Sequence, residues 1–464
     1  MIKRIFVLPV TILYAIVLEA SSFLPSQNVP PSADNGLVRI EAGDRILIFA
    51  PHPDDEILGC AGIIQKARVL KVPVRIVFLT FGDSNEWSFL LYRKHPVVMP
   101  KAVEGMGEIR HDEAVKAAGV LDIPPEDLIF LGYPDFGTQA IWRSHWAQNA
   151  PYESILTKVN AVPYSNAFRP GALYKGEEIL ADLEKILREF KPTKIFVTHA
   201  ADHNGDHQAA YLFTRVALWD LKEEISAQIY PFLIHFKNWP KPRGYRPGEF
   251  LRPPGPITAE IQWRNSFLTE KELQKKELAL REHRTQYDSS AVYLNSFIKE
   301  NEMFGDFLVI KLGDGHKVVN ISPGAQAYIK DVPEYLTDEE KFSFSAFEQR
   351  YIGVEDGELV FTIKLSRPLV EATGLSLFAF GYRLDRPFGE MPKLHIKVGL
   401  LRHEIFDQGK IINASSITIE RRGRSIKLQI PFELLGNPDH VLTSAQLQLG
   451  DVPLDLGAWR VLEL

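Results

Sequence analysis

Cysteine is almost absent from this chain of 464 residues, in which Cys60 stands alone. A single cysteine excludes an intrachain disulfide framework. The formal net charge is −6 and no block of lysine or arginine stands out, which argues against nucleic acid as a partner. No Gly-x-Gly-x-x-Gly sequence follows the apolar run at 46–50, the first expected strand, so a dinucleotide-binding site has no support. Since 45% of the residues are hydrophobic, the chain can form at least two cores.

Long hydrophobic runs are also scarce, and the one at the N-terminus has the pattern of an export signal. Lys3 and Arg4 precede the apolar run 5–18, and small residues follow at 20–22. This run is short for a transmembrane helix and typical of the core of a signal peptide. We therefore expect residues 1–22 to direct export to the periplasm or the extracellular space, with 23–43 as a linker. No cysteine follows, which excludes a lipoprotein anchor, but an uncleaved membrane anchor remains as the alternative.

Polar residues follow directly on an apolar segment near residue 50. The run 46–50 has the composition of a buried parallel strand, and Pro51 ends it. A histidine and three acids come next, namely His52, Asp54, Asp55 and Glu56. Helix capping accounts for one or two of these acids. It does not account for three adjacent acids beside a histidine, because packed carboxylates repel one another unless a cation or protons offset their charge.

The same arrangement recurs near residue 200. The apolar run 194–198 leads into a segment rich in histidine and aspartate, and a helix-like segment follows. Its polar residues are His199, Asp202, His203, Asp206 and His207. In open α/β sheets, ligands bind at the carboxyl ends of the strands. Two such clusters, each between a strand and a helix, therefore indicate a metal site.

The two clusters resemble the motifs of the PIG-L/LmbE family, which comprises zinc-dependent deacetylases that remove N-acetyl groups from N-acetylglucosaminyl substrates. The motifs are Pro-His-Pro-Asp-Asp-Glu at 51–56 and Asp-x-Asn/His-x-Asp-His at 202–207. Supporting matches lie at 107–114, 131–137 and 282–286, so the resemblance spans about residues 44–312.

The resemblance implies a role for most of the polar residues. The zinc (Zn2+) ligands would be His52, Asp55 and His207, a set that leaves one position open for water. Asp54 would be the general base. Asp206 would orient a neighbouring group.

The resemblance leaves the group that stabilises the oxyanion undecided. Several family members carry a histidine where this chain has Asn204, whose amide can also donate a hydrogen bond to an oxyanion. The alternative is the adjacent His203. If Asn204 fills this position, Asp54 would serve as both base and acid, because the amide of asparagine does not ionise and cannot act as an acid. Arg110 and Asp135 match substrate-contacting positions, although Arg110 would equally suit an ion pair on a helix surface.

Alternating strands and helices predict the fold of residues 44–312. Strands are expected at 46–50, 74–80, 128–131, 194–198 and 230–235, with helices at 109–118, 176–190 and 268–286. This pattern predicts an α/β fold with a Rossmann-like, mostly parallel sheet. Two long connections, 85–106 and 137–174, contain aromatic residues that would form substrate walls or pack on the domain. Those of the second are Trp142, Trp146 and Tyr152.

The pattern changes at about residue 338. Apolar and polar residues alternate with a period of two at 359–365 and 394–398, and a turn at 422–424 separates two further alternating runs. We therefore expect a linker at 313–337 and a C-terminal all-β sandwich domain at 338–464, which would bind glycan or pack on the enzyme.

Together these features predict an exported zinc hydrolase that releases acetate from an N-acetylated amino sugar or glycan. One alternative is an amidase of the same fold acting on another acylated small molecule, such as an antibiotic or a thiol precursor. The other is a non-catalytic glycan-binding protein, which would have no need of a base beside the metal. The sugar and the oligomeric state are not predictable from the sequence.

Overall fold

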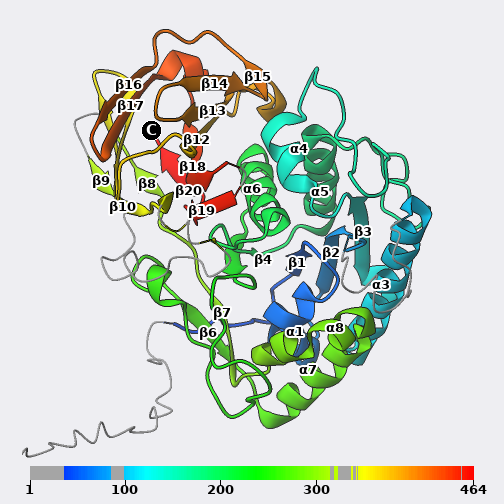
Figure 1. Ribbon diagram of the computed structural model, residues 1–464. Helices are drawn as coiled ribbons and strands as arrows, with labels where there is room; N and C mark the ends of the chain where they lie inside the picture. Colours follow the sequence, from blue (N-terminus) through cyan, green and yellow to red (C-terminus); the bar gives the residue numbers. More distant parts are fainter. Residues whose placement is uncertain are drawn as a thin grey trace, which may run out of the picture.

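The computed structural model describes residues 36–84, 99–313, 318–321, 336–337, 341, 343–450 and 452–464. The expected export signal and the aromatic residues of the first long connection lie outside this part of the chain. Within it, no helix combines the length and the apolar character needed to span a bilayer. The described chain consists of an α/β part and a β part that pack on each other (Figure 1).

The α/β part contains a five-stranded parallel sheet, as the sequence predicts, in the order β3-β2-β1-β4-β5. Its strands are β1 (Ile46–Ala50), β2 (Val74–Thr80), β3 (Leu128–Tyr133), β4 (Lys194–Thr198) and β5 (Gln228–Phe232). The chain builds outward from β1 to β3 and then returns to add β4 on the other side of β1. The strand order therefore reverses between β1 and β4, which is where open α/β sheets bind ligands.

Helices cover both faces of this sheet (Figure 1). They are α1 (Asp55–Val69), α3 (Pro100–Val120), α4 (Thr138–Ser144), α5 (Gly176–Phe190), α6 (Gly205–Asp220), α7 (Glu270–Glu282) and α8 (Arg284–Leu294). Helix α7 contacts both α1 and α3, and helix α6 contacts both α4 and α5. A two-stranded ribbon of β6 (Arg264–Phe267) and β7 (Asn301–Phe304) packs beside α1.

Two predicted helices have different bounds in the structure. Helix α3 begins at Pro100 rather than near 109, because proline suits the first turn of a helix, so the predicted connection 85–106 is too long. The predicted helix 268–286 is two helices, because the backbone at His283 leaves the helical region (φ −75°, ψ 62°). A capping box of Thr269 and Glu272 starts the first of them.

The β part contains two sheets around a second core, which are antiparallel except where β8 pairs in parallel with β20. One sheet has the order β16-β17-β11-β10-β9 and the other β15-β14-β13-β12-β18-β20-β8, with β19 paired to β18. Their strands are β8 (Ile310–Lys311), β9 (Val319–Asn320), β10 (Phe347–Glu355), β11 (Glu358–Leu365), β12 (Thr373–Tyr382), β13 (Lys393–Val398), β14 (His403–Asp407), β15 (Lys410–Ile411), β16 (Thr418–Arg422), β17 (Ser425–Pro431), β18 (His440–Leu449), β19 (Val452–Leu456) and β20 (Arg460–Glu463). Strands β8 and β9 precede residue 338 yet pair with β20 and β10. The exact domain boundaries stay a prediction.

The two parts share a continuous apolar core. Trp142 and Trp146, for which the sequence suggested a substrate wall, are buried in it and pack against Phe388 of the β part. The substrate-wall prediction is therefore wrong for these two residues. Helical spacing shows which side of α4 is apolar, but it does not show which part of the chain covers that side.

Candidate active site

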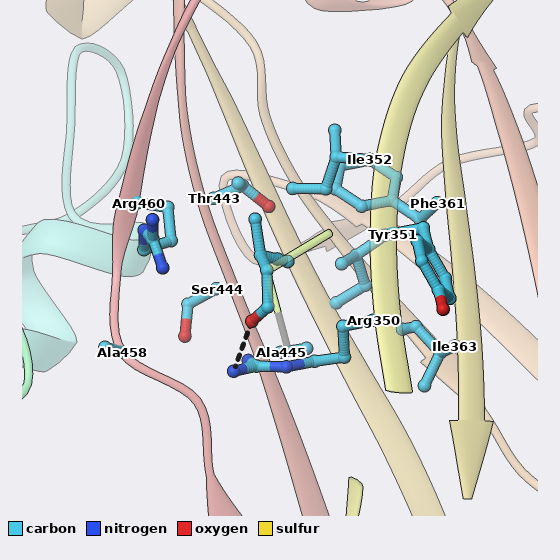
Figure 2. A pocket seen from close by; sticks show the side chains of 12 residues that line it. Arg350, Tyr351, Ile352, Phe361, Ile363, Thr443, Ser444, Ala445, Ala458 and Arg460 are labelled. Atoms are coloured by element: carbon cyan, nitrogen blue, oxygen red, sulfur yellow. Dashed lines mark hydrogen bonds between the residues drawn. The ribbon is translucent and has the colours of Figure 1, made fainter. Parts of the chain in front are cut away.

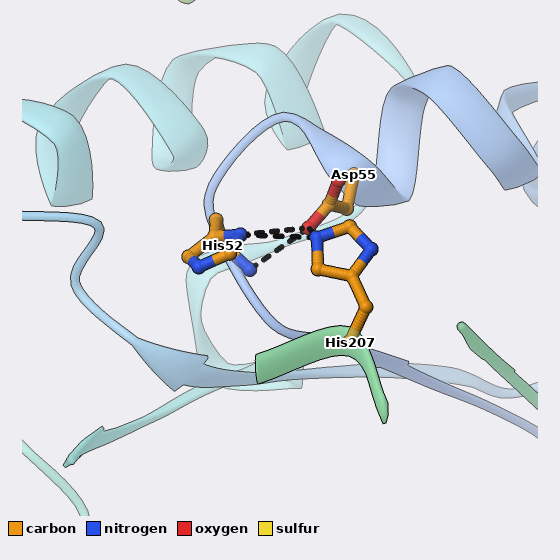
Figure 3. A group of neighbouring side chains, drawn as sticks. All are labelled: His52, Asp55 and His207. Atoms are coloured by element: carbon orange, nitrogen blue, oxygen red, sulfur yellow. Dashed lines mark hydrogen bonds and ion pairs between the residues drawn. The ribbon is translucent and has the colours of Figure 1, made fainter. Parts of the chain in front are cut away.

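The two predicted clusters meet at the carboxyl edge of the parallel sheet. Strands β1 and β4 are neighbours in parallel register, so the segments that follow them leave the sheet at the same edge. The first segment leads into α1 and carries His52 and Asp55, while the second leads into α6 and carries His207. Figure 3 shows these three side chains pointing toward one another.

The facing atoms of these three side chains are almost equally spaced. His52 Nδ1 lies 3.3 Å from Asp55 Oδ2, His207 Nε2 lies 3.2 Å from the same oxygen, and the two nitrogens are 3.2 Å apart. A tetrahedral zinc with bonds of about 2.0–2.1 Å separates its ligand atoms by roughly 3.3–3.4 Å. The three residues are buried and fit such an ion.

The outer nitrogens of both imidazoles face carboxylates. His207 Nδ1 lies 3.1 Å from Asp202 Oδ2, and His52 Nε2 lies 3.3 Å from Asp206 Oδ2 and 3.0 Å from Asp135 Oδ1. These partners assign each N–H to the outer nitrogen and leave the inner lone pairs for a metal. His52, Asp135 and Asp206 also lie close enough to hold an ion, but there the imidazole presents its N–H.

Carboxylates around the two imidazoles make the cluster attractive to positive charge. Burial lowers the pKa of His207, but Asp202 and Asp55 outweigh it and raise that pKa to about 9. The pKa of His52 is likewise held well above its ordinary value, chiefly by Asp135 against the effect of burial. The cluster thus holds protons or a cation in a buried position.

Asp206 ties the loop after β3 to this cluster. Its Oδ2 accepts a hydrogen bond from the Phe136 N–H (2.6 Å), and its Oδ1 accepts from the N–H (3.1 Å) and hydroxyl (2.5 Å) of Thr138. The same loop carries Asp135, whose Oδ2 accepts from the Ser84 N–H (2.9 Å). Asp206 therefore holds Asp135 against the outer side of the metal cluster.

Asp202 is a functional candidate that the sequence did not assign beyond the cluster itself. Besides facing His207, its carboxylate accepts hydrogen bonds from the N–H groups of Asn204, Ile234 and His235 at 2.9–3.0 Å. The neighbouring His207 imidazole and, to a smaller extent, the Asn204 N–H hold the Asp202 pKa at about 2, although burial raises it. Asp202 opens the motif at 202–207, but its partners Ile234 and His235 after β5 follow no recognisable motif.

Asp54 has an unusual backbone conformation for a residue other than glycine (φ 123°, ψ −28°). Such conformations cost on the order of 1–3 kcal/mol and persist only where the surroundings hold them. The Asp54 N–H donates to Glu56 Oε2 (2.9 Å), and Glu56 Oε1 lies 3.0 Å from His283 Nε2. Glu56 and His283 are fully buried. Glu56, itself held by His283, therefore fixes the backbone of Asp54 in this conformation.

Arg110 supports the same turn from the other side. Its Nη2 donates to the Pro53 carbonyl and its Nη1 to the Gly82 carbonyl, both at 2.6 Å. Nη2 also lies 3.8 Å from Asp54 Oδ2. Because Arg110 is only 3% exposed, the alternative of an ion pair on a helix surface is wrong. Burial and the charge of Asp55 raise the pKa of Asp54 to about 7 despite the opposing effect of Arg110.

A cavity of about 570 Å³ opens over this site. Its polar lining comprises His52, Asp54, Asp55, Ser84, Arg110, Asp135, Ser154, Asn204, His235, Gln286 and Ser290. Its apolar and aromatic lining comprises Leu58, Phe136, Tyr152, Ile155, Leu156, Tyr293 and Leu294. The predicted base and both predicted substrate-contacting residues thus face one cavity, and Tyr152 forms part of its wall.

Asn204 and His203 differ in their access to this cavity. Asn204 lines it, and its Oδ1 accepts from the Asp206 N–H (2.8 Å), which leaves the amide NH2 as the group that can donate to a substrate. The His203 ring packs against Phe236 and is not part of the lining. Of the two alternatives for the oxyanion group, the position favours Asn204. His235, which no sequence motif marked, lines the cavity where His203 does not.

A second cavity lies inside the β part but is too small for a substrate. It has a volume of about 20 Å³, room for about one water molecule, and Figure 2 shows its lining between the two sheets. Ser444 and Arg350 line it, and Arg350 Nη2 donates to the Ile321 carbonyl (3.3 Å).

Comparison with known proteins finds one family model that spans both clusters. The family model for PIG-L, described as GlcNAc-PI de-N-acetylase, matches residues 47–218. The chain is similar to that family over this range. The PIG-L match includes β1, β4 and both predicted motifs, and it is shorter than the 44–312 that the sequence suggested.

A curated protein similar to this chain is 1D-myo-inositol 2-acetamido-2-deoxy-alpha-D-glucopyranoside deacetylase 1 of Saccharopolyspora erythraea. The two are 28% identical over 189 residues, which cover 38% of this chain and 54% of the relative. The chain thus spans about half the length of that relative.

Solved structures of lower identity also match this chain. N,N'-diacetylchitobiose deacetylase from Pyrococcus horikoshii is 18% identical, with a TM-score of 0.35 and coverage of 56% of this chain and 82% of that one. The A40926 pseudoaglycone deacetylase is 14% identical, with a TM-score of 0.36 and coverage of 56% and 96%.

Proposed function

We propose that this protein is an exported, zinc-dependent N-deacetylase that releases acetate from an N-acetylated amino sugar. The observation that carries the proposal is the convergence of His52, Asp55 and His207 at 3.2–3.3 Å, with Asp54 beside them in the same cavity. The PIG-L match and the acetamido-sugar substrate named for the curated relative support the choice of reaction and substrate class.

Asp54 and Asn204 have complementary tasks in this reaction. His52, Asp55 and His207 would hold the zinc, which would supply Lewis-acid chemistry that makes water more acidic and polarises the acetyl carbonyl. Asp54 takes the proton from the attacking water, and the Asn204 amide donates a hydrogen bond to the carbonyl oxygen as it gains negative charge. Asp54 then returns the proton to the leaving nitrogen. The amide of Asn204 donates a hydrogen bond but cannot act as a general acid, because it does not ionise.

The cavity suits a sugar in size and lining. Its volume of about 570 Å³ lies within the usual range for small-molecule sites. Polar side chains such as Ser290 and Asp135 supply groups for hydroxyls, while Tyr152 and Phe136 offer aromatic surface for the apolar face of a sugar ring. The export part of the proposal depends on residues 1–22 alone, and fractionation of cells that express the full chain tests it.

Acetate release from a panel of N-acetylglucosaminyl compounds tests the proposed reaction. The full-length protein loaded with zinc should release acetate and a free amine from at least one of them, and a chelator should abolish the release. Cleavage of other acyl amides alone would favour an amidase of different specificity. Sugar binding without any hydrolysis, in protein that retains its metal, would favour a glycan-binding protein.

A further inference from the structure

Helix α6, which carries His207 in its first turn, lies between the parallel sheet and the β-sandwich (Figure 1). It contacts β1 and β4 on one side. Near its other end, the Tyr382 hydroxyl of the sandwich donates to Asp220 Oδ1 (2.9 Å), and the Trp219 and Tyr382 rings are 4.8 Å apart. The helix is therefore held by both parts of the molecule along its length.

Gln208, the residue after His207, joins three segments through one buried amide. Its Nε2 donates to the Asp202 carbonyl (2.7 Å), and its Oε1 accepts from Gln139 Nε2 (2.8 Å) and from the indole N–H of Trp459 (3.2 Å). Trp459 is in the sandwich, just before β20. The side chain of Gln208 is thus fixed by α4, by the segment after β4 and by the β part.

Trp459 also binds the other side of the segment that carries the metal ligands. Its main-chain N–H donates to the Ala200 carbonyl (3.2 Å), two residues after β4 ends. Asp202 lies between Ala200 and Gln208, and its carboxylate faces His207 Nδ1. Trp459 thus donates hydrogen bonds to residues on both sides of Asp202 in the chain, and Asp202 orients the His207 imidazole.

We propose that the β-sandwich is a structural part of the metal site, and that Trp459 acts as a positioning residue for His207 through Gln208 and Asp202. This inference rests on the proposed metal ligands. Groups behind metal ligands typically change metal affinity by 10–100-fold when they are removed, because they fix the ligand orientation. The sandwich then serves the catalytic site directly, rather than acting as a detachable binding module.

A simpler role for Trp459 is to fill the interface, and Trp142 provides the matched control. Its ring lies 6.5 Å from that of Trp459 in the same aromatic cluster, and both are buried. The Trp142 Nε1 has no hydrogen-bond partner among the described residues. Replacing either tryptophan by phenylalanine removes the same volume, but only Trp459→Phe removes a hydrogen bond.

Zinc affinity of the full chain, measured by competition with a chromogenic chelator, tests the proposal. Trp459→Phe should raise the Kd for zinc about tenfold, and Trp142→Phe should change it less than threefold. Hydrogen exchange of the amides at 199–208 should quicken in the first variant alone. Equal Kd values and equal exchange in the two variants would overturn the proposal.

Gln208→Met keeps the test decisive if Trp459→Phe fails to fold, because it removes the amide while leaving Trp459 intact. It should weaken zinc binding at least as much as is expected of Trp459→Phe. Where Trp459→Phe does fold, adding it to Gln208→Met should cause no further loss, since the two residues act through one bond. Fully additive losses would contradict the proposal. Wild-type protein that binds no zinc would instead refute the proposed metal site, and the exchange of residues 199–208 would still decide the role of Trp459.

Discussion

The parallel sheet and the β-sandwich place their polar residues differently. Every residue of β1 and β4 is buried, because helices cover both faces, so polar side chains gather where these strands end. In β17, buried residues alternate with half-buried ones, and polar side chains are spread along the strand. In the described part of the sandwich, no three His, Cys, Asp or Glu residues are placed to hold a metal ion.

The candidate catalytic groups therefore belong to the parallel sheet, whereas the sandwich contributes packing. The parallel sheet concentrates imidazoles and carboxylates at the edge where β1 and β4 end, and buried carboxylates repel one another there. The described part of the sandwich carries no such cluster but packs large aromatic residues against helices α4 and α6. Most changes to the sandwich should therefore affect folding, whereas changes at the sheet edge should affect metal binding and rate.

Removal of residues 338–464 should have the largest effect, namely loss of soluble, folded protein. The deletion uncovers Trp142 and Trp146, whose rings pack against Phe388 of the sandwich. Exposing two such rings costs on the order of 10 kcal/mol, as much as the whole stability of a typical domain. Soluble yield and thermal unfolding measure this, with removal of 1–22 as the control. A soluble truncated protein that binds zinc would show that the sandwich is dispensable.

His207→Ala should remove the metal while leaving the fold intact. The wild type should hold about one zinc per chain, and the variant should lose most of it together with acetate release, because two donors remain of three. His203→Ala is the matched control, since its ring packs against Phe236 outside the cavity. Metal analysis and the melting temperature of both variants measure the outcome. Full zinc retention in His207→Ala would refute the ligand set.

Glu56→Gln should lower kcat about tenfold with little change in KM or zinc content. The substitution keeps the shape of the side chain but leaves only one oxygen to accept from the Asp54 N–H and from His283. Asp54 then loses part of the support for its strained backbone. Glu113→Gln, at a buried acid that accepts from Thr285, is the control. Unchanged kcat in Glu56→Gln would show that the strain at Asp54 is held by other groups.

Lys393, at the contact between the two parts, should produce a smaller effect that depends on pH. Its Nζ donates to the Phe388 and Met391 carbonyls and lies over the Trp146 ring. Burial lowers the Lys393 pKa from 10.5 to about 7. Between these values the unfolded chain binds more protons than the folded one, so this residue makes the free energy of unfolding rise with pH.

Lys393→Met removes this dependence. Relative to the variant, the wild type should gain about 1.4 kcal/mol per pH unit between pH 7 and 10. Denaturant unfolding at pH 7, 8.5 and 10 measures the difference. A constant difference across that range would mean that Lys393 keeps its charge in the folded protein.

The sequence was enough to predict those site residues that directly follow neighbouring parallel strands. The apolar runs that became β1 and β4, with a polar motif after each, were enough to bring His52 and His207 together, because parallel strands end at the same edge. The fold class was predicted for the same reason.

Contacts between distant segments were not predictable in this way. Asp202 orients His207 with help from backbone groups after β5, and Trp142 is covered by the sandwich. His283, which ends α7, supports Asp54 through Glu56 across more than two hundred residues of chain. No local pattern marks such partners, since each depends on how two separate elements pack.

The central claim is that Asp54 and Asp55, adjacent in the chain, have different tasks. Asp55 faces both imidazoles, whereas Asp54 lies beside Arg110 at the cavity. Bound zinc and kcat, measured together in Asp54→Asn and Asp55→Ala, test this most directly. Asp54→Asn should keep its zinc while kcat falls by about 10²–10⁴-fold, as expected for loss of a general base, and Asp55→Ala should lose the metal. Loss of zinc in Asp54→Asn with retention in Asp55→Ala, or wild-type kcat in Asp54→Asn, would contradict it.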